Sequence, residues 1–185
     1  MPGEEQVLIA SAQAGDREAF EQLTRPYSAR LLRVLLRITR SQEAAEDAMQ
    51  DALLRAWQNL PRFQGQSSFF TWMTRIAINE AYRTLQRLQA RATLPLDDAV
   101  GERIPNWAAR PEETFESREF LGAVESALGR LPLEYRQAVV LRDVEGFSTR
   151  EAAEALGIEE RALKSRLHRG RMALRRELDD FFGDD

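Results

Sequence analysis

Apolar residues recur every three or four positions along most of this chain, and no window shows the strict alternation of a half-buried strand. The clearest helical segment covers about 16–39, with apolar positions at Phe20, Leu23, Tyr27, Leu31, Leu35 and Ile38. Asp16 precedes this segment as a suitable N-cap, and Ser41 can cap a second, alanine-rich helix that we expect to reach Leu60. A third helix is predicted over about 68–89. The pattern therefore predicts an all-α fold.

Residues 90–112 interrupt the helical pattern. They have few regular apolar repeats and contain the helix-breaking residues Pro95, Gly101, Pro105 and Pro111. We interpret this stretch as an exposed, flexible linker. The chain is then expected to form two small helical domains, one at 1–89 and the other at 113–185.

The last part of the chain has the pattern of a helix-turn-helix. The Ser-Thr-Arg-Glu sequence at 148–151 has the form of a capping box and predicts a short helix over 149–156. Gly157 ends that helix, and a longer one should follow from 158 or 159 to about 178. The expected packing face comprises Ala152, Ala153, Leu156, Ile158, Leu163 and Leu167. Gly170 lies on the same stripe, where another backbone could approach closely.

Positive charge is concentrated on this final helix, although the whole chain has a formal net charge of −4. Residues 161–176 include seven basic side chains and no acidic one. One face of the expected helix holds Arg161, Lys164, Ser165, His168, Arg169 and Arg171. Long cationic side chains on one face can reach phosphates and the acceptor edge of guanine, so we predict a DNA-binding surface. The alternative is a solvated, arginine-rich surface helix.

Composition excludes several kinds of site. The chain has no cysteine and one histidine, His168, which rules out disulfides, thiolate sites and multi-histidine metal sites. No glycine-rich phosphate loop is present, and no apolar run approaches the ~20 residues of a membrane span. The N-terminus is acidic and lacks an apolar signal region. We expect a cytoplasmic protein without catalytic activity, metal, cofactor or membrane insertion.

Three stretches of the second half carry a family resemblance. Leu-Pro-Leu-Glu-Tyr-Arg-Gln-Ala-Val-Val-Leu at 131–141, the capping-box helix at 146–157 and Leu-Lys-Ser-Arg-Leu-His-Arg-Gly-Arg at 163–171 resemble the C-terminal promoter-binding domain of bacterial sigma factors. The closest likeness is to the extracytoplasmic-function (ECF) group of the sigma-70 family. This resemblance implies binding of the upstream (−35) promoter element and places at the DNA Lys164, Ser165, Arg166, His168, Arg169 and Arg171.

One position departs from the family pattern. The family often has Gly-Thr-Val before the Lys-Ser-Arg sequence, whereas this chain has Arg161-Ala162-Leu163. A hydroxyl contact to phosphate is lost at Ala162, and we expect Arg161 to replace it in the −35 site.

The first half resembles the same family in the segment 45–57, Ala-Glu-Asp-Ala-Met-Gln-Asp-Ala-Leu-Leu-Arg-Ala-Trp. The matching helix of the family docks on the clamp helices of the RNA polymerase β′ subunit. Asp47, Gln50, Asp51 and Arg55 lie on neighbouring turns and would form the polymerase-binding strip. Spacing alone is also typical of an ordinary solvated face, and it is the resemblance that favours docking.

Residues 63–79 resemble the family segment that melts and reads the downstream (−10) element. Capture of an unstacked base needs a pocket, polar groups for the base edge and cations for the backbone. The expected −10 site comprises the loop Phe63, Gln64, Gly65, Gln66, Ser67 and Ser68 together with Arg75, Asn79 and Arg83, and Arg87 is a further candidate for phosphate binding. Phe69, Trp72 and Ile76 have the spacing of core residues, so Phe63 is the better candidate for stacking on a base.

The resemblance implies an alternative sigma factor that binds core RNA polymerase, recognises promoter DNA and directs strand opening. An inhibitory anti-sigma partner is expected from the family alone. One alternative is a response-regulator type of helix-turn-helix protein, which binds DNA by itself as a dimer. Another is an enzyme with metal-binding carboxylates at Glu43, Glu46, Asp47 and Asp51 in a helical bundle.

Overall fold

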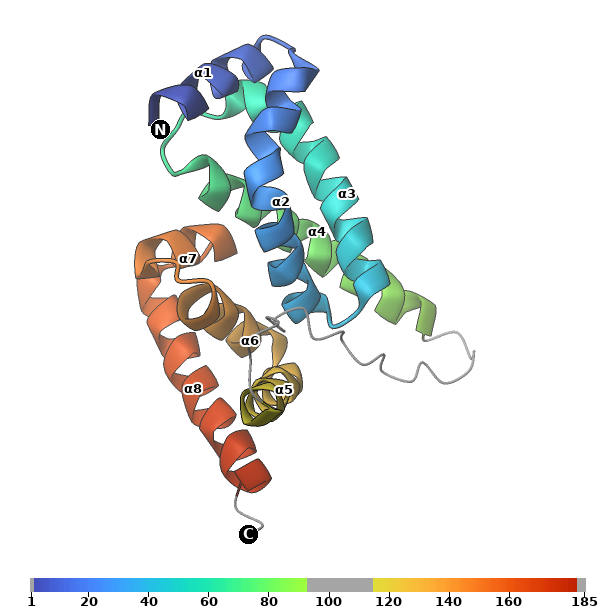
Figure 1. The fold of residues 1–185 in the computed structure, drawn as a ribbon, viewed down its shortest axis with the longest axis vertical. Coiled ribbons are helices and arrows are strands. Elements are labelled where there is room, and N and C mark those ends of the chain that lie inside the picture. The colour runs from blue at the N-terminus through green and yellow to red at the C-terminus, as the bar shows by residue number, and fades with distance from the viewer. Residues whose placement is uncertain (1, 93–114, 183–185) are drawn as a thin grey trace.

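The computed structural model describes residues 2–92 and 115–182, which are helical with no strand among them. The first lobe contains α1 (Pro2–Gln13), α2 (Arg17–Thr39), α3 (Gln42–Asn59), a 3₁₀ turn η1 (Leu60–Arg62) and α4 (Phe69–Ala92). The second contains α5 (Phe115–Arg130), α6 (Leu133–Val139), a π-helical segment η2 (Val140–Val144), α7 (Thr149–Leu156) and α8 (Glu160–Phe182). The two lobes lie side by side (Figure 1). The all-α prediction is confirmed, whereas nearly all of the predicted linker at 90–112 falls outside the described residues.

The predicted helix starts in the first lobe are correct. The carboxylate of Asp16 accepts hydrogen bonds from the backbone N–H groups of Glu18 and Ala19, at 2.9 and 3.2 Å. The hydroxyl of Ser41 accepts one from the N–H of Ala44 at 3.2 Å. Each cap satisfies backbone donors that have no partner within the helix, and this fixes where α2 and α3 begin.

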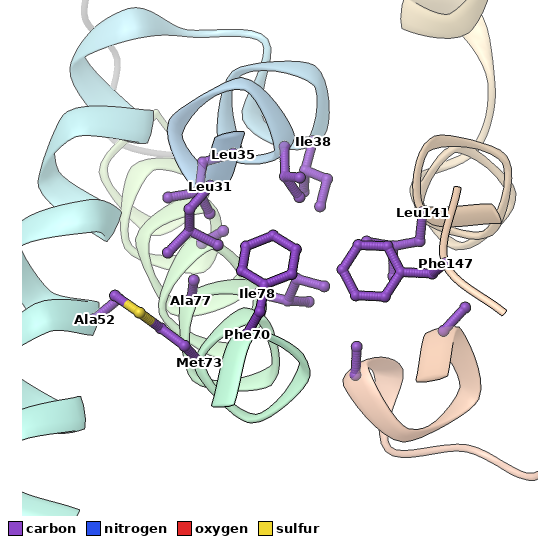
Figure 2. Packing of buried hydrophobic residues seen from close by; sticks show 14 of the residues in the cluster. Leu31, Leu35, Ile38, Ala52, Phe70, Met73, Ala77, Ile78, Leu141 and Phe147 are labelled. Atoms are coloured by element: carbon purple, nitrogen blue, oxygen red, sulfur yellow. The ribbon is translucent and has the colours of Figure 1, made fainter. Parts of the chain in front are cut away.

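Alanine allows α3 to lie close to its neighbours. The alanines of its inner face, which are almost completely buried, are Ala44, Ala45, Ala48, Ala52 and Ala56. This face packs against α2 and α4. Figure 2 shows the side chain of Ala52 beside Met73 of α4, and Met73 is fully buried. Small residues let the backbones approach, so α4 is firmly supported along one side.

Helix α1 was not predicted from the sequence. Its apolar residues Val7, Leu8 and Ile9 are consecutive and do not follow helical spacing, which explains why the pattern gave no signal. Leu8 and Ile9 pack against the core and Ala12 is buried, while Val7 is 64% exposed. The helix is therefore stabilised by contacts with α2 and η1.

The helix-turn-helix forms as predicted. The Ser148 hydroxyl accepts from the Glu151 N–H at 3.2 Å, and the Glu151 carboxylate accepts from the Ser148 N–H at 2.9 Å. These hydrogen bonds to Ser148 lower the pKa of Glu151. Gly157 ends α7 with a φ of 64°, a left-handed conformation that suits glycine. Helix α8 begins at Glu160 and extends four residues beyond the predicted end at 178.

Gly170 is the point at which α8 crosses α6. A Cβ atom at this position would lie 2.8 Å from Cγ2 of Val139 and 3.2 Å from the carbonyl oxygen of Tyr135. Val139 is buried and β-branched, so it has little room to move. The predicted close approach of another backbone at Gly170 is confirmed.

The two lobes meet through aromatic and ionic contacts. Phe70 of α4 and Phe147 of the second lobe are stacked with ring centroids 5.4 Å apart, as Figure 2 shows. The guanidinium of Arg30 lies 4.5 Å from the centre of the Phe70 ring within the first lobe and 5.3 Å from that of Phe147 in the second. The carboxylate of Glu145, only 7% exposed, is 3.1 Å from Nε of Arg30 and 3.0 Å from Nη1 of Arg37. Glu145 thus joins the second lobe to two positions of α2.

We predict that Gly170→Val destabilises the protein by about 1–3 kcal/mol, because the added side chain overlaps Val139 and the backbone of α6. The measurement is urea unfolding. Gly122→Val is the matched control, since a Cβ at Gly122 of α5 has nothing within 4 Å. That control should be neutral or stabilising by a few tenths of a kcal/mol. Equal effects of the two substitutions would contradict the close approach.

We predict that Glu145→Ala weakens the contact between the lobes, because Arg30 and Arg37 then lose their shared acceptor. The loss should be about 1–3 kcal/mol. The chain has no cysteine, so dyes on cysteines introduced at Gln58 and Glu160 can report the distance between lobes by energy transfer. The mean distance should increase in Glu145→Ala and stay unchanged in Glu119→Ala, which alters an exposed glutamate of the same lobe. An unchanged distance in both variants would show that Glu145 does not hold the lobes together.

Candidate DNA-binding and polymerase-binding surfaces

The outer face of α8 carries most of the predicted −35 residues. The side chains that are exposed there are Arg161, Lys164, Ser165, His168, Arg169 and Arg171. Leu163, Leu167 and Gly170 lie on the opposite, buried face. Arg166 differs from the other predicted residues, because it is partly buried and lies 3.5 Å from a carboxylate oxygen of Glu134.

Contacts within the second lobe divide the cations of α8 into two groups. Arg171 donates two hydrogen bonds to Asp143, at 2.8 and 2.6 Å, and this contact raises the pKa of Arg171. Arg169 donates to the Tyr135 hydroxyl at 3.5 Å, which raises the pKa of Arg169. Arg161 and Lys164 form no ion pair with any residue that the structure describes. These two side chains are the least constrained cations on the predicted DNA-facing surface.

The loop that we expected to capture a base is anchored at both ends. At its start, the ring of Phe63 packs on Trp72 with centroids 5.0 Å apart and edge-to-face on Phe69 at 6.0 Å. At its end, the Ser68 hydroxyl accepts from the Thr71 N–H at 3.1 Å, as an N-cap of α4. The residues between these anchors that are exposed are Gln64, Gly65 and Gln66, while Ser67 is partly buried. Gly65 has a φ of 68°, which favours glycine in this turn.

The predicted −10 residues of α4 share one exposed face. Arg75, Asn79 and Arg83 are all exposed, at helical spacing. Arg83 is held by Glu80 at 2.5 Å, whereas Arg75 has no ion pair within residues 2–92 or 115–182. Tyr82, which is 49% exposed, lies on the same side and was missed by the sequence reasoning. Tyr82 follows Asn79 by three residues and Arg75 by seven, so helical spacing could have placed it on this face.

Phe69 is buried, and Trp72 and Ile76 are partly buried against the core, as the sequence predicted for all three. The additional phosphate candidate, Arg87, is paired with Asp51 of α3 at 3.0 Å. Phe63 remains accessible in part, although its ring is already in contact with two aromatic neighbours.

The predicted polymerase-binding strip forms the outer side of α3. Asp47 and Gln50 are exposed, while Asp51 is partly buried beside Arg87. Arg55 is exposed and lies 2.5 Å from the buried carboxylate of Glu80. Leu54, which is 61% exposed, lies among these polar residues and was not singled out from the sequence. Leu54 follows Asp47 by seven residues and Gln50 by four, so helical spacing alone places it on the same face as these residues.

Within the described ranges, no three or more His, Asp or Glu side chains are grouped so that they could hold a metal ion. The carboxylates at 43–51 therefore do not form the site that the enzyme alternative required. None of the helices in those same ranges is long and apolar enough to cross a membrane.

Two family models match the chain, one to each lobe. The model described as sigma-70 region 2 matches residues 23–91, which include the α3 strip, the 63–68 loop and most of α4. The model described as sigma-70 region 4 matches residues 121–174, which include α7 and the exposed face of α8.

Curated relatives match along nearly the whole chain. The ECF RNA polymerase sigma factor SigM of Mycobacterium tuberculosis is 37% identical over 171 residues, which are 92% of this chain and 83% of that protein. The ECF RNA polymerase sigma-E factor of Escherichia coli is 31% identical, with 92% of each chain covered. The RNA polymerase sigma-H factor of Pseudomonas aeruginosa is 30% identical and covers 95% of this chain and 94% of its own.

Solved structures share the fold. CnrH, determined in complex with the cytosolic domain of CnrY, superimposes with a TM-score of 0.70 at 27% identity, covering 98% of this chain and 99% of its own. RpoE of Bartonella quintana, determined with the anti-sigma factor NepR, has a TM-score of 0.69 at 24% identity, covers 86% of this chain and 96% of its own, and supports the fold alone. Since relatives above 30% identity span the greater part of both chains, this chain belongs to the ECF group of RNA polymerase sigma factors.

Proposed function

We propose that this chain is an alternative sigma factor which binds core RNA polymerase, recognises promoter DNA and directs strand opening. The observation that carries the proposal is the exposed cationic face of α8, presented by a capped helix-turn-helix. We assign residues 1–89 to polymerase and the −10 element, 90–112 to a linker and 113–185 to the −35 element. Sigma factors are initiation factors and not enzymes, so the chain supplies binding energy and no catalytic group.

In the −35 complex, α8 lies in the major groove. Arg161 and Lys164 have no internal ion pair and contact phosphate or a guanine edge. Ser165 and His168 are exposed on the same face and complete the contact surface. Arg171 and Arg169 are oriented by Asp143 and Tyr135, which reduces the conformational entropy lost when they meet the DNA backbone.

On polymerase, the docking surface is the outer side of α3. Asp47, Gln50 and Leu54 are exposed together, so the strip combines polar groups with one apolar anchor. Asp51 and Arg55 are each held by a residue of α4, which fixes the strip relative to the −10 surface. We propose that this strip binds the β′ clamp helices.

Strand opening follows from the same docking. Binding energy offsets the few kcal/mol needed to unstack a base, so no nucleotide hydrolysis is required. The exposed part of the 63–68 loop receives the base, and Asn79 hydrogen-bonds its edge or the neighbouring nucleotide. Arg75 and Arg83 on the same face of α4 contact the backbone phosphates.

The lobes must separate for both promoter elements to be bound at once. A Cβ at Gly157, in the turn before α8, would lie 3.9 Å from Nη2 of Arg75, a −10 residue. The two promoter elements are separate sites along one duplex, which rises ~3.4 Å per base pair, so each DNA-binding surface must reach its own stretch of DNA. We propose that the contact between Phe70 and Phe147 belongs to a conformation that does not occupy both elements.

The site of action is the cytoplasm, where the polymerase lies. We also propose an anti-sigma partner that covers the polymerase- and DNA-binding faces, because the structural relative CnrH was determined in complex with the cytosolic domain of another protein, CnrY. The response-regulator alternative predicts DNA binding without polymerase. A pull-down with core polymerase, followed by a promoter gel shift with and without it, distinguishes the two.

We predict that Lys164→Ala weakens holoenzyme binding to the upstream element several-fold. Loss of one phosphate contact should reduce the slope of log affinity against log salt by about 1. Arg175→Ala is the control, because it removes an exposed cation further along α8 that is outside the predicted site and near Asp179. Fluorescence anisotropy across a salt series measures both. An unchanged slope in Lys164→Ala would contradict the assigned orientation of α8.

We predict that Asp47→Arg weakens binding to core polymerase at least about tenfold, or ~1.4 kcal/mol, because it reverses the charge of an exposed residue at the first position of the strip. Glu21→Arg makes an equivalent charge reversal on an exposed position of α2 and should bind normally. Competition against a labelled sigma factor measures the affinity. Equal loss in both variants would point to a nonspecific effect of charge.

A further inference from the structure

The side chain of Gln13 connects α1 to the beginning of the base-capturing loop. Its amide nitrogen donates to the carbonyl oxygen of Leu60 at 3.0 Å and to that of Phe63 at 2.9 Å. An amide nitrogen has two hydrogens, so these two bonds use its full donor capacity. They join residues that are 47 and 50 positions apart in the chain.

Gln13 is itself held in place. It is the last residue of α1, and the helix end is closed by hydrogen bonds from the N–H groups of Ala14 and Gly15 to carbonyls of the preceding turn. Ala12 is buried beside it, and at the other end of α1 the Tyr27 hydroxyl donates to Glu5 at 3.0 Å. Helix α1 is therefore a fixed support from which the Gln13 amide reaches the loop.

The loop depends on this support at one end only. Its far end is fixed by the Ser68 cap of α4, and the exposed residues between have one side-chain contact, from Gln66 to Gln64 at 3.2 Å. At the near end, the Leu60 carbonyl also accepts from the Phe63 N–H at 2.9 Å, which closes the η1 turn. The bond from Gln13 to the Phe63 carbonyl, together with the packing of the Phe63 ring on Trp72 and Phe69, fixes the direction in which the chain enters the loop.

We propose that Gln13 is a positioning residue for base capture, which fixes the entry of the 63–68 loop so that the exposed residues receive an unstacked base. This inference rests on the proposed function of that loop. Gln13 precedes residues 23–91, to which the region 2 model matches, so the assignment comes from its contacts and not from the family pattern.

The test uses holoenzyme assembled from core polymerase and four versions of the chain, on a promoter identified from wild-type transcript starts. The versions are wild type, Gln13→Glu, Gln13→Ala and Tyr27→Phe. Glutamate keeps the shape of glutamine but presents oxygens to the two carbonyls. Tyr27→Phe removes the hydrogen bond from the Tyr27 hydroxyl to Glu5 of α1. It keeps the ring that stacks on Phe70 and leaves the contacts of Gln13 with the loop intact.

Each −10 position is substituted in turn, and the rate of open-complex formation is measured by permanganate reactivity. Base selectivity is the ratio of the natural rate to the rate on the least tolerated substitution. We expect Gln13→Glu and Gln13→Ala to lower the rate of open-complex formation about tenfold on the natural promoter and by less than twofold on the substituted promoter. Selectivity then falls toward 1. Tyr27→Phe should keep wild-type selectivity. Hydrogen exchange of the 64–68 amides should accelerate in the Gln13 variants only.

Three results would overturn the proposal. One is an equal loss of rate on natural and substituted promoters, which indicates a general loss of stability. Another is unchanged selectivity in folded Gln13 variants that bind polymerase normally. The third is an equal loss of selectivity in Tyr27→Phe, which would assign the effect to α1 as a whole. Failure of the proposed function can be distinguished from failure of this inference, because the wild-type chain would then not bind polymerase or not initiate transcription.

Discussion

Close approach of helix backbones at small residues is the constraint on which both proposed DNA-binding surfaces depend. In the first lobe, the buried alanines of α3 bring α4 close enough for Ala52 to lie beside Met73. In the second, Gly170 lets α8 cross α6 where any Cβ would overlap Val139. Each helix is thus held along one face by tight packing, which leaves the opposite face free for long polar side chains. In the proposed function, rigidity on the buried side allows the exposed side to be positioned on DNA.

The contact between the lobes has a different character, because the proposed function requires it to form and break. It combines a stacked pair, Phe70 and Phe147, with a glutamate placed between Arg30 and Arg37. Charged groups can be solvated again when the lobes part, whereas a purely apolar interface of the same size would resist opening. Because Glu145 is only 7% exposed, leaving its carboxylate in place without Arg30 and Arg37 would be costly. The contact between the lobes therefore combines specific partners with groups that water can solvate when the lobes separate.

Much of the fold could be predicted because its signals are local. The caps at Asp16, Ser41 and Ser148 and the glycine at 157 each act within a few residues, and all four occur as expected. Helix α1 could not be found in this way, because its apolar residues are consecutive and its stability comes from distant partners. The ion pair of Arg171 with Asp143 and the contacts of Gln13 join residues far apart in sequence. Spacing along one helix predicts which side chains share a face, but not which of them are already occupied.

The two functional surfaces of the first lobe are joined through Glu80. This carboxylate is 2% exposed and lies 2.5 Å from both Arg55, on the proposed polymerase strip, and Arg83, on the proposed −10 face. A carboxylate buried to that degree is costly to leave without a cation. If Arg83 leaves Glu80 to meet a DNA phosphate, Arg55 must stay with Glu80 and is then unavailable to polymerase as a free charge. Because Glu80 pairs with both arginines, the charge that Arg55 of α3 offers to polymerase depends on whether Arg83 of α4 is bound to Glu80 or to DNA.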